Sequence, residues 1–233
     1  MRVGIIAALP GELKPLVRGW ELQRSGVKGL SVWKRLQGGD ELIAVSGGMG
    51  SHAAIRSVVA AEFFGALDML ISVGWAGALN ATVKTGQCYE VSTVIDVQTG
   101  ERYGAGDRPG MRLVTAHQVV DAAEKQRLHQ SYGADLVDME AASVARLAQM
   151  RDVPFYCFKA VSDSLDAELP DMNGFIDVQG QMQMMPFLAH VAARPRYWGA
   201  LLELGKNSSV AAHAIAKEVN GFLDRRDMKN GQV

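Results

Sequence analysis

The chain has 233 residues, 48% of them hydrophobic, and a formal net charge of −1 at neutral pH. This length and hydrophobic content predict one fairly large domain with a well-filled core. Basic residues are scattered among acidic ones, which argues against a nucleic-acid-binding protein, because a phosphate backbone is recognised by a concentrated positive surface.

Two features predict a cytoplasmic protein. Residues 1–9 have one arginine and an apolar run, as a secretory signal has, but Pro10-Gly11-Glu12 ends the run too early. No later run approaches membrane-spanning length without a charge or a glycine. Cys88 and Cys157 both fall inside predicted strands, where buried thiols are typical of a reducing compartment rather than of a disulfide framework.

The first predicted strand spans residues 3–8, and its unbroken apolar and small side chains are typical of a central strand covered on both faces. Pro10-Gly11 then turns the chain, and the apolar residues after Glu12 continue at helical spacing. Glu12 therefore falls in the first turn of a helix, close to the carboxyl end of the strand. It either serves a site there or only complements the helix dipole.

Two alternating segments, residues 30–35 and 41–46, predict neighbouring strands joined by a glycine-rich turn. The second leads into the glycines of residues 47–50 and then into a helix that ends near residue 64. Free N–H groups in such a turn suit an anion or a hydroxyl-rich sugar, so Gly48 is a candidate ligand contact. Alternatively, the glycines serve only tight packing. His52, which follows them, has no second His or Cys at metal-binding spacing, and we expect no metal.

An apolar run at residues 67–73 predicts a further strand, which Gly74-Trp75-Ala76-Gly77 closes. Trp75 either covers a ligand or fills a gap in the core. Beyond it, we expect a strand at residues 88–97, an exposed loop or short hairpin at residues 99–112 and a further strand at residues 113–115. A helix with Asp121 as its N-cap is expected at residues 121–132.

The central feature of the sequence is the pair of carboxylates Asp138 and Glu140. Residues 134–137 predict the end of a buried strand and residues 141–150 a helix, so Glu140 lies at a strand-to-helix junction, where α/β proteins place ligand sites. Glu12 and Asp163 lie at similar junctions after their own strands. Three acids at three strand exits predict one pocket.

The alternation of strands and helices predicts a three-layer α/β/α domain with a mixed, mostly parallel twisted sheet, spanning residues 1–233 as one unit. Residues 170–180 are irregular. A methionine-rich segment at residues 181–188 precedes helices that end near residue 223, and the polar residues 224–233 are expected to fray.

Several motifs occur together in a fixed order, namely Gly4-Ile5-Ile6 to Glu12, Gly48-Met49-Gly50, Gly74 to Gly77, Val137 to Glu140, and Ser162-Asp163. Together they resemble the purine nucleoside phosphorylase and nucleosidase superfamily, most closely 5′-methylthioadenosine/S-adenosylhomocysteine nucleosidase. The shorter middle region of the chain and the tail at residues 169–204 are similar to the hopanoid-associated branch of the superfamily. Members of that branch resemble a nucleosidase acting on adenosylhopane. The resemblance implies a nucleoside phosphorylase-like fold, a homodimer, and no metal or organic cofactor.

The resemblance also implies roles for individual residues. Glu12 matches the acid that activates the attacking water, Glu140 the acid that holds the ribose hydroxyls, and Asp163 the acid that protonates purine N7. The implied substrate contacts are Met139 against ribose and base, Asp138 beside it, Ser162 orienting Asp163, and Val119 and Val120 lining the base pocket.

Three positions depart from the family pattern. Trp75 takes the place of a serine that the nucleosidases usually have near the nucleophile, and Lys159 takes the place of an arginine beside it. Val119 replaces an aromatic residue that stacks on adenine. These departures put the usual substrates in doubt, because a less tightly stacked base or a bulkier 5′ group would fit them equally well.

The chemistry of N-ribosyl cleavage explains why these residue types are needed. Positive charge develops on the sugar, and the base leaves as a poor anion unless it is protonated. An ionised Glu140 would accept hydrogen bonds from the ribose and offset that charge. We expect burial or neighbouring carboxylates to keep Asp163 protonated near neutral pH.

The attacking nucleophile is predicted to be water. Phosphorylases of the superfamily hold phosphate with a Gly-Asp-Pro-x-Arg segment and a second arginine, and the corresponding places here hold Pro10-Gly11-Glu12 and Ser72. We therefore expect a nucleosidase that releases adenine from a 5′-substituted adenosine. The alternatives are a phosphate-dependent phosphorylase and a non-catalytic nucleoside-binding module. The methionine-rich segment either forms core or dimer contacts, or meets a lipid-like 5′ group or a membrane surface.

Overall fold

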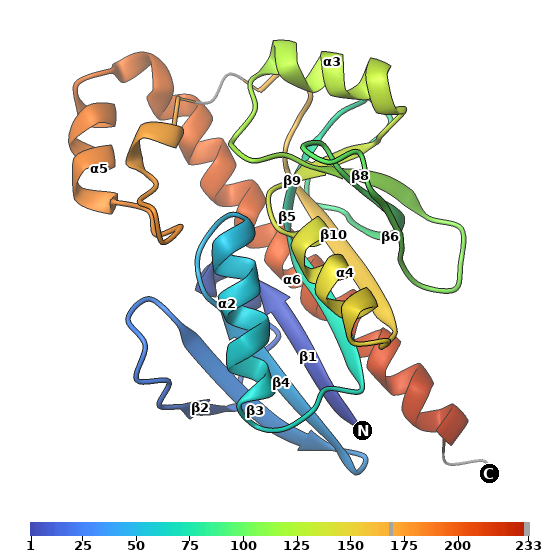
Figure 1. Ribbon diagram of the computed structural model, residues 1–233. Coiled ribbons are helices and arrows are strands. Elements are labelled where there is room, and N and C mark those ends of the chain that lie inside the picture. Colours follow the sequence, from blue (N-terminus) through green and yellow to red (C-terminus); the bar gives the residue numbers. More distant parts are fainter. Residues whose placement is uncertain (168–169, 231–233) are drawn as a thin grey trace.

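The computed structural model describes residues 1–167 and 170–230, and Figure 1 shows a sheet with helices on both faces. Its strands are β1 (Arg2–Ala7), β2 (Glu21–Gln23), β3 (Ser31–Gln37), β4 (Asp40–Ser46), β5 (Met69–Ala78), β6 (Cys88–Asp96), β7 (Arg102–Gly104), β8 (Met111–Thr115), β9 (Leu136–Asp138) and β10 (Phe155–Asp163). Its helices are α1 (Pro10–Leu13), α2 (Ser51–Glu62), α3 (Ala122–Tyr132), α4 (Ala141–Met150), α5 (Met184–Ala192) and α6 (Trp198–Asn230), with 3₁₀ turns η1 (Asn173–Phe175) and η2 (Pro195–Tyr197).

The sheet is mixed and partly closed. The strand order is β10-β6-β8-β9-β5-β1-β4-β3-β2, and β10 also pairs with β5, so β5, β10, β6, β8 and β9 form a closed ring. The strands β4, β1, β5 and β10 run parallel to one another, whereas β9 runs antiparallel to β5. This arrangement confirms the predicted α/β architecture with a mixed central sheet.

Two apolar clusters explain the three layers. On one face, α2 and α4 pack small buried side chains such as Ala54 and Ala145 against the sheet. On the other face, α1 and the long α6 cover β1, β5 and β10, with Leu13 and Ile215 in the second cluster (Figure 1). The buried pattern of β1, in which five of six residues are buried, fits a strand covered on both sides.

The structure corrects one prediction about element ends. The run at residues 67–73 does not stop at Gly74, because β5 continues to Ala78 and the segment Gly74 to Gly77 pairs with β10 along its length. The helix α6 includes residues 224–230, whose fraying stays a prediction, and residues 168–169 and 231–233 lie outside the described part of the chain. The N-cap role of Asp121 is confirmed by the hydrogen bond that its side chain accepts from the N–H of Glu124.

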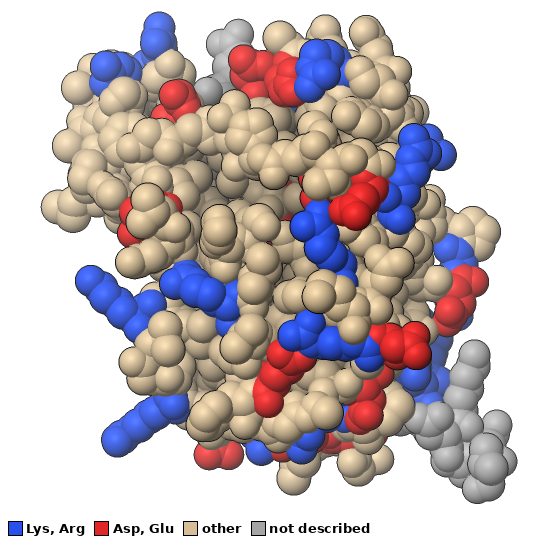
Figure 2. Space-filling view, viewed as in Figure 1, with Lys and Arg blue, Asp and Glu red and all other residues tan. Residues whose placement is uncertain are grey.

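Three features of the described residues concern the surface of the protein: the distribution of charges, the hydrophobicity of the helices and two exposed methionines. On the face seen in Figure 2, the described acidic and basic side chains are interspersed. Within residues 1–167 and 170–230, no helix is both long and apolar enough to cross a membrane. On α5, Met184 and Met185 are exposed to solvent.

Candidate active site

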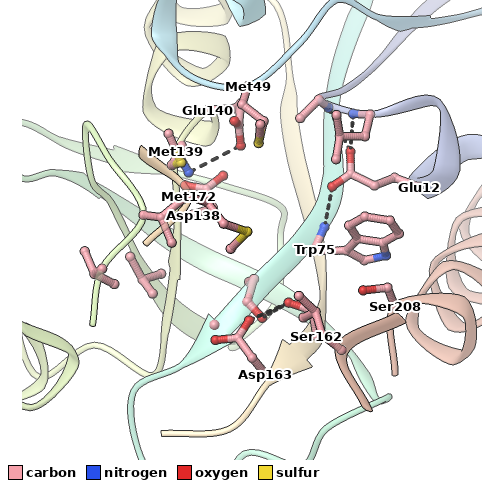
Figure 3. A pocket seen from close by; sticks show the side chains of 18 of the residues that line it. Glu12, Met49, Trp75, Asp138, Met139, Glu140, Ser162, Asp163, Met172 and Ser208 are labelled. Carbon is pink, nitrogen blue, oxygen red and sulfur yellow. Dashed lines mark hydrogen bonds between the residues drawn. The ribbon is translucent and has the colours of Figure 1, made fainter. Parts of the chain in front are cut away.

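A cavity of about 220 Å³ opens where β1, β5 and β10 end, and all three predicted acids line it (Figure 3). Glu12 comes from α1, Glu140 from the residue before α4, and Asp163 from the last position of β10. The same cavity is lined by the predicted contacts Asp138, Met139, Ser162, Val119, Val120 and Trp75. A volume of this order suits a small molecule rather than a polymer.

Glu12 is held by the backbone. Its Oε2 accepts hydrogen bonds from the N–H groups of Ala8 at 2.9 Å and Leu9 at 2.8 Å, and its Oε1 accepts one from the N–H of Trp75 at 2.8 Å. The side chain is buried, and burial raises the pKa of Glu12 above its ordinary value although these hydrogen bonds oppose the shift. A carboxylate with a raised pKa is a stronger base, which suits the activation of water.

Gly74 makes room for this carboxylate. Its φ of +152° lies in a region that side-chain-bearing residues rarely adopt, and a Cβ at this position would lie 2.9 Å from Glu12 Oε1. Gly74, which we interpreted as the end of a strand, therefore lies inside β5, where it lets the carboxylate of Glu12 come close to the strand.

The position of Trp75 is compatible with both of the roles that the sequence left open. Its side chain packs against the cluster beneath α1 and α6, and it also lines the cavity beside Glu12 (Figure 3). Its buried indole Nε1 has no hydrogen-bond partner among the described residues. The tryptophan thus narrows the cavity on the side where Glu12 lies.

Glu140 lies in a group of buried charges. Gly50 N–H donates to its Oε1 at 2.7 Å, so the glycine-rich turn binds this side chain. Burial, with the charge of Asp138 as the next cause, raises the pKa of Glu140 to about 8, and the ammonium of Lys159 opposes the shift. A pKa in this range favours the protonated form of Glu140 near neutral pH, whereas the sequence analysis expects an ionised carboxylate. The physical reason is its burial beside a second carboxylate.

Asp138 and Lys159 form a buried ion pair behind the cavity. Lys159 Nζ lies 2.8 Å from Asp138 Oδ2, and the lysine side chain is 1% exposed. Burial is the largest influence on Lys159 and disfavours its charge, but the acidic groups around it, Asp138 first, together raise the pKa of the ammonium above its ordinary value. Asp138 Oδ1 also accepts a hydrogen bond from the hydroxyl of Thr115 at 2.7 Å. Asp138 lines the cavity, whereas Lys159 lies behind it and does not.

Asp163 has side-chain partners on both of its oxygens. The hydroxyl of Ser162 donates to Oδ1 at 2.6 Å, and Lys125 Nζ lies 2.5 Å from Oδ2. The side-chain groups that contact the carboxylate of Asp163 are therefore one hydroxyl and one ammonium.

Two of the predicted contacts do not line the cavity. Gly48 donates its N–H to the carbonyl of Ala8 at 2.9 Å, and a Cβ there would lie 2.8 Å from the carbonyl oxygen of Gly180, so this glycine serves packing. Lys159 lies behind the cavity against Asp138, as described above. The lining of the cavity also includes residues that the sequence analysis did not select as contacts, namely Lys125, Met49, Met172, Met182, Leu204 and Ser208.

Among these, Lys125 carried the weakest sequence signal, because it lies in a helix of polar composition. Its only indication was its spacing of three residues from Leu128, which places both on the buried side of α3. Elsewhere in the described ranges, no cluster of three or more His, Cys, Asp or Glu residues has the geometry of a metal site.

The fold and the site together define a class: an α/β/α protein with a ring-closed mixed sheet and a small carboxylate-lined cavity at its strand ends. The model of the phosphorylase superfamily matches residues 2–123 and 108–185, and the chain belongs to this superfamily. Among curated proteins, none matches the sequence.

Solved structures of low sequence identity share the fold. Futalosine hydrolase of Helicobacter pylori superposes with a TM-score of 0.72 at 14% identity, covering 97% of this chain and 99% of that one. The 5′-methylthioadenosine nucleosidase of Arabidopsis thaliana gives 0.71 at 17% identity, with 96% and 94% covered. The 5′-methylthioadenosine/S-adenosylhomocysteine nucleosidase of Helicobacter pylori gives 0.69 at 16% identity, with 97% and 98% covered.

Proposed function

We propose that this protein is a nucleosidase that hydrolyses the N-ribosyl bond of a 5′-substituted adenosine and releases adenine. The observation that carries the proposal is the meeting of Glu12, Glu140 and Asp163 around one small cavity, although they are far apart in the sequence. The membership of the phosphorylase superfamily and the fold shared with nucleosidases support the same reaction.

Glu12 is the proposed base for water. Its two oxygens are fixed by three backbone N–H groups, so the carboxylate cannot rotate away from the cavity. A positioned general base contributes on the order of 10²- to 10⁴-fold to the rate. As the C1′–N9 bond lengthens, Glu12 takes a proton from water, and the water oxygen bonds to C1′.

Glu140 is the proposed ribose contact. With its proton, it can donate one hydrogen bond to a ribose hydroxyl and accept another, and it is anchored by the N–H of Gly50. The charges of Asp138 and Lys159 act on Glu140 in opposite directions: Asp138 favours its protonated form and Lys159 its ionised form. The electrons of the broken bond go to the base, where Asp163 delivers a proton to N7.

Water is favoured over phosphate by the charges in the cavity. Of the described residues that line the cavity, Lys125 is the single cation, and its ammonium is already paired with the carboxylate of Asp163. Phosphate needs cationic or N–H partners, whereas the N–H groups of Ala8, Leu9 and Trp75 all point at Glu12. An acid in that position repels an anionic nucleophile.

The 5′ group is proposed to be apolar. Half-buried Met49, Met172, Met182 and Leu204 line the cavity, and their flexible side chains adapt to different apolar shapes. Methylthioadenosine and adenosylhopane have apolar 5′ groups and fit this lining. S-adenosylhomocysteine, whose 5′ group ends in a charged amino acid, is the contrasting candidate, and futalosine belongs in the comparison because a hydrolase of that nucleoside shares the fold.

The experiment is the release of adenine or another base from these nucleosides and from adenosine, each with and without phosphate. Chromatography should give free base and a free ribosyl sugar at the same rate in both conditions. Strict phosphate dependence with ribose 1-phosphate as product would assign a phosphorylase instead. Tight binding of nucleosides without any release of base would assign a binding module.

A further inference from the structure

Lys125 is an unusual residue for its helix. The other side chains of α3 are exposed or half-buried, apart from the apolar Leu128, yet the side chain of Lys125 is 2% exposed. A lysine ammonium is costly to bury unless it is paired and hydrogen-bonded. Its contacts therefore indicate why the chain buries a charge here.

Both contacts of the ammonium lie at the end of β10. Lys125 Nζ donates to Asp163 Oδ2 at 2.5 Å and to the carbonyl of Ser164 at 2.5 Å. Both side chains of the pair line the cavity, so the ammonium lies beside the space where a ligand would bind. A lysine that only stabilised the fold would not need to face this space.

The neighbouring strand leaves room for the pair. A Cβ on Gly77 would lie 3.1 Å from Asp163 Oδ2 and 3.1 Å from Lys125 Cε, which is tighter than ordinary contact. Ser162 holds the other oxygen of Asp163, so both oxygens of the carboxylate are fixed. The geometry thus specifies one orientation of the acid, with a hydroxyl on one oxygen and an ammonium on the other.

We propose that Lys125 is a positioning residue that controls proton donation by Asp163 to the leaving base. The inference rests on the proposed function. The ammonium holds Asp163 in the orientation described above, and it supplies the proton that the carboxylate passes on.

The step balances as follows. The C1′–N9 bond breaks, and its electron pair stays on the base. The carboxylate of Asp163 takes a proton from Lys125 Nζ on Oδ2 and passes a proton to N7, so that Asp163 is a carboxylate again and Lys125 becomes a neutral amine. After the base leaves, a proton from solvent restores the ammonium. The proton that Glu12 takes from water returns to solvent, and no further reactant is required.

Two substrates separate this role from a merely structural one. An adenine nucleoside that the wild-type protein cleaves needs a proton on its leaving group, whereas the 4-nitrophenolate of a 4-nitrophenyl riboside leaves without one. In Lys125→Met, which keeps the length of the side chain, kcat for the nucleoside should fall by about 10²-fold or more with little change in KM. The kcat for the nitrophenyl riboside should hardly change.

Amine rescue tests the same role with the nucleoside alone. Lys125→Ala leaves a space that propylammonium can enter, and kcat should rise with the concentration of the amine. Asp163→Asn should not respond to the amine, because the group that transfers the proton is missing. Arg127→Met is the matched control for the helix, since Arg127 lies two residues away with a side chain that is 56% exposed.

The outcomes are distinct. If the wild-type protein releases base and Lys125→Met has near-normal kcat for the nucleoside, the inference is wrong and the proposed function stands. It is equally wrong if Lys125→Met loses the same activity toward both substrates, or if no amine restores Lys125→Ala while thermal melting shows both variants folded. If the wild-type protein releases base from no nucleoside, the proposed function itself is wrong.

Discussion

Glu12 and Asp163 lie beside the same strand, β5, and are held in different ways. Glu12 lies next to Gly74 and Trp75, and its partners are backbone N–H groups, which no substitution except proline removes. Asp163 lies next to Gly77, and its partners are the side chains of Ser162 and Lys125. The first acid is positioned by the path of the main chain, and the second by residues that evolution or mutagenesis can change. The two parts of the cavity should therefore respond differently to similar substitutions.

The largest effect is expected from Asp163→Asn. The amide can accept from Lys125 through its oxygen and donate to Ser162 Oγ, so the fold should be kept, but it cannot pass a proton to the base. We expect kcat to fall by about 10²- to 10⁴-fold with little change in melting temperature. Adenine release measures kcat, and thermal melting measures the stability of the fold. Near-normal turnover would rule out the role of Asp163.

Glu12→Gln should affect both activity and stability. It removes the base, which should lower kcat by about 10²-fold or more. It also turns an NH₂ group toward backbone N–H donors that then lack an acceptor, at a cost of about 1–3 kcal/mol in the free energy of unfolding. Urea denaturation of this variant beside Asp163→Asn tests the contrast. Equal stability of the two variants would contradict the difference between backbone-held and side-chain-held acids.

Glu140 should make the stability depend on pH. Its pKa of about 8 in the folded chain lies above the ordinary value of 4.5, so the folded state binds more protons than the unfolded state between these values. Stability must then fall as pH rises through that window, by about 2 kcal/mol between pH 6 and pH 8. Glu140→Gln should lose this dependence and be the more stable protein at pH 8. Melting curves of both proteins at the two pH values provide the measurement, and parallel pH dependences would contradict it.

Gly74→Ala should have the smallest effect, on the order of 1 kcal/mol of destabilisation. Its Cβ would press on Glu12 Oε1 from a backbone conformation unfavourable to alanine, so some activity should be lost as well. The matched control is Gly199→Ala in α6, where nothing lies within 4 Å of the added Cβ. That control should leave the stability unchanged or raise it by about 0.5–1 kcal/mol, because alanine favours a helix. A stable Gly74→Ala protein would show that Glu12 can shift without cost.

Much of the fold was predictable because its signals are local. The helix Ala141–Met150 was expected over the same residues, and the N-cap of Asp121 follows from its own side chain. The end of β5 was missed because glycines usually end strands, whereas Gly74 and Gly77 here leave space for Glu12, Asp163 and Lys125. Their glycine identity is explained by neighbours that are distant in the sequence.

The meeting of the three acids was also predicted, but for a reason that holds only in part. Glu12 and Asp163 follow parallel strands, whose carboxyl ends lie at one edge of the sheet. Glu140 follows β9, which is antiparallel to β5 and pairs with its last residues, Gly77 and Ala78. Because β9 is only three residues long, its carboxyl end still lies beside the cavity.

The sequence by itself determined the layers, most element positions and the three acids, because apolar periodicity and capping residues act over a few neighbouring positions. The tertiary structure alone decided the partners of those acids. The burial of Lys125 against Asp163, the pairing of Lys159 with Asp138 and the proton on Glu140 depend on elements brought together by the sheet. Charges interact through space over a few ångströms, and only folding sets those distances.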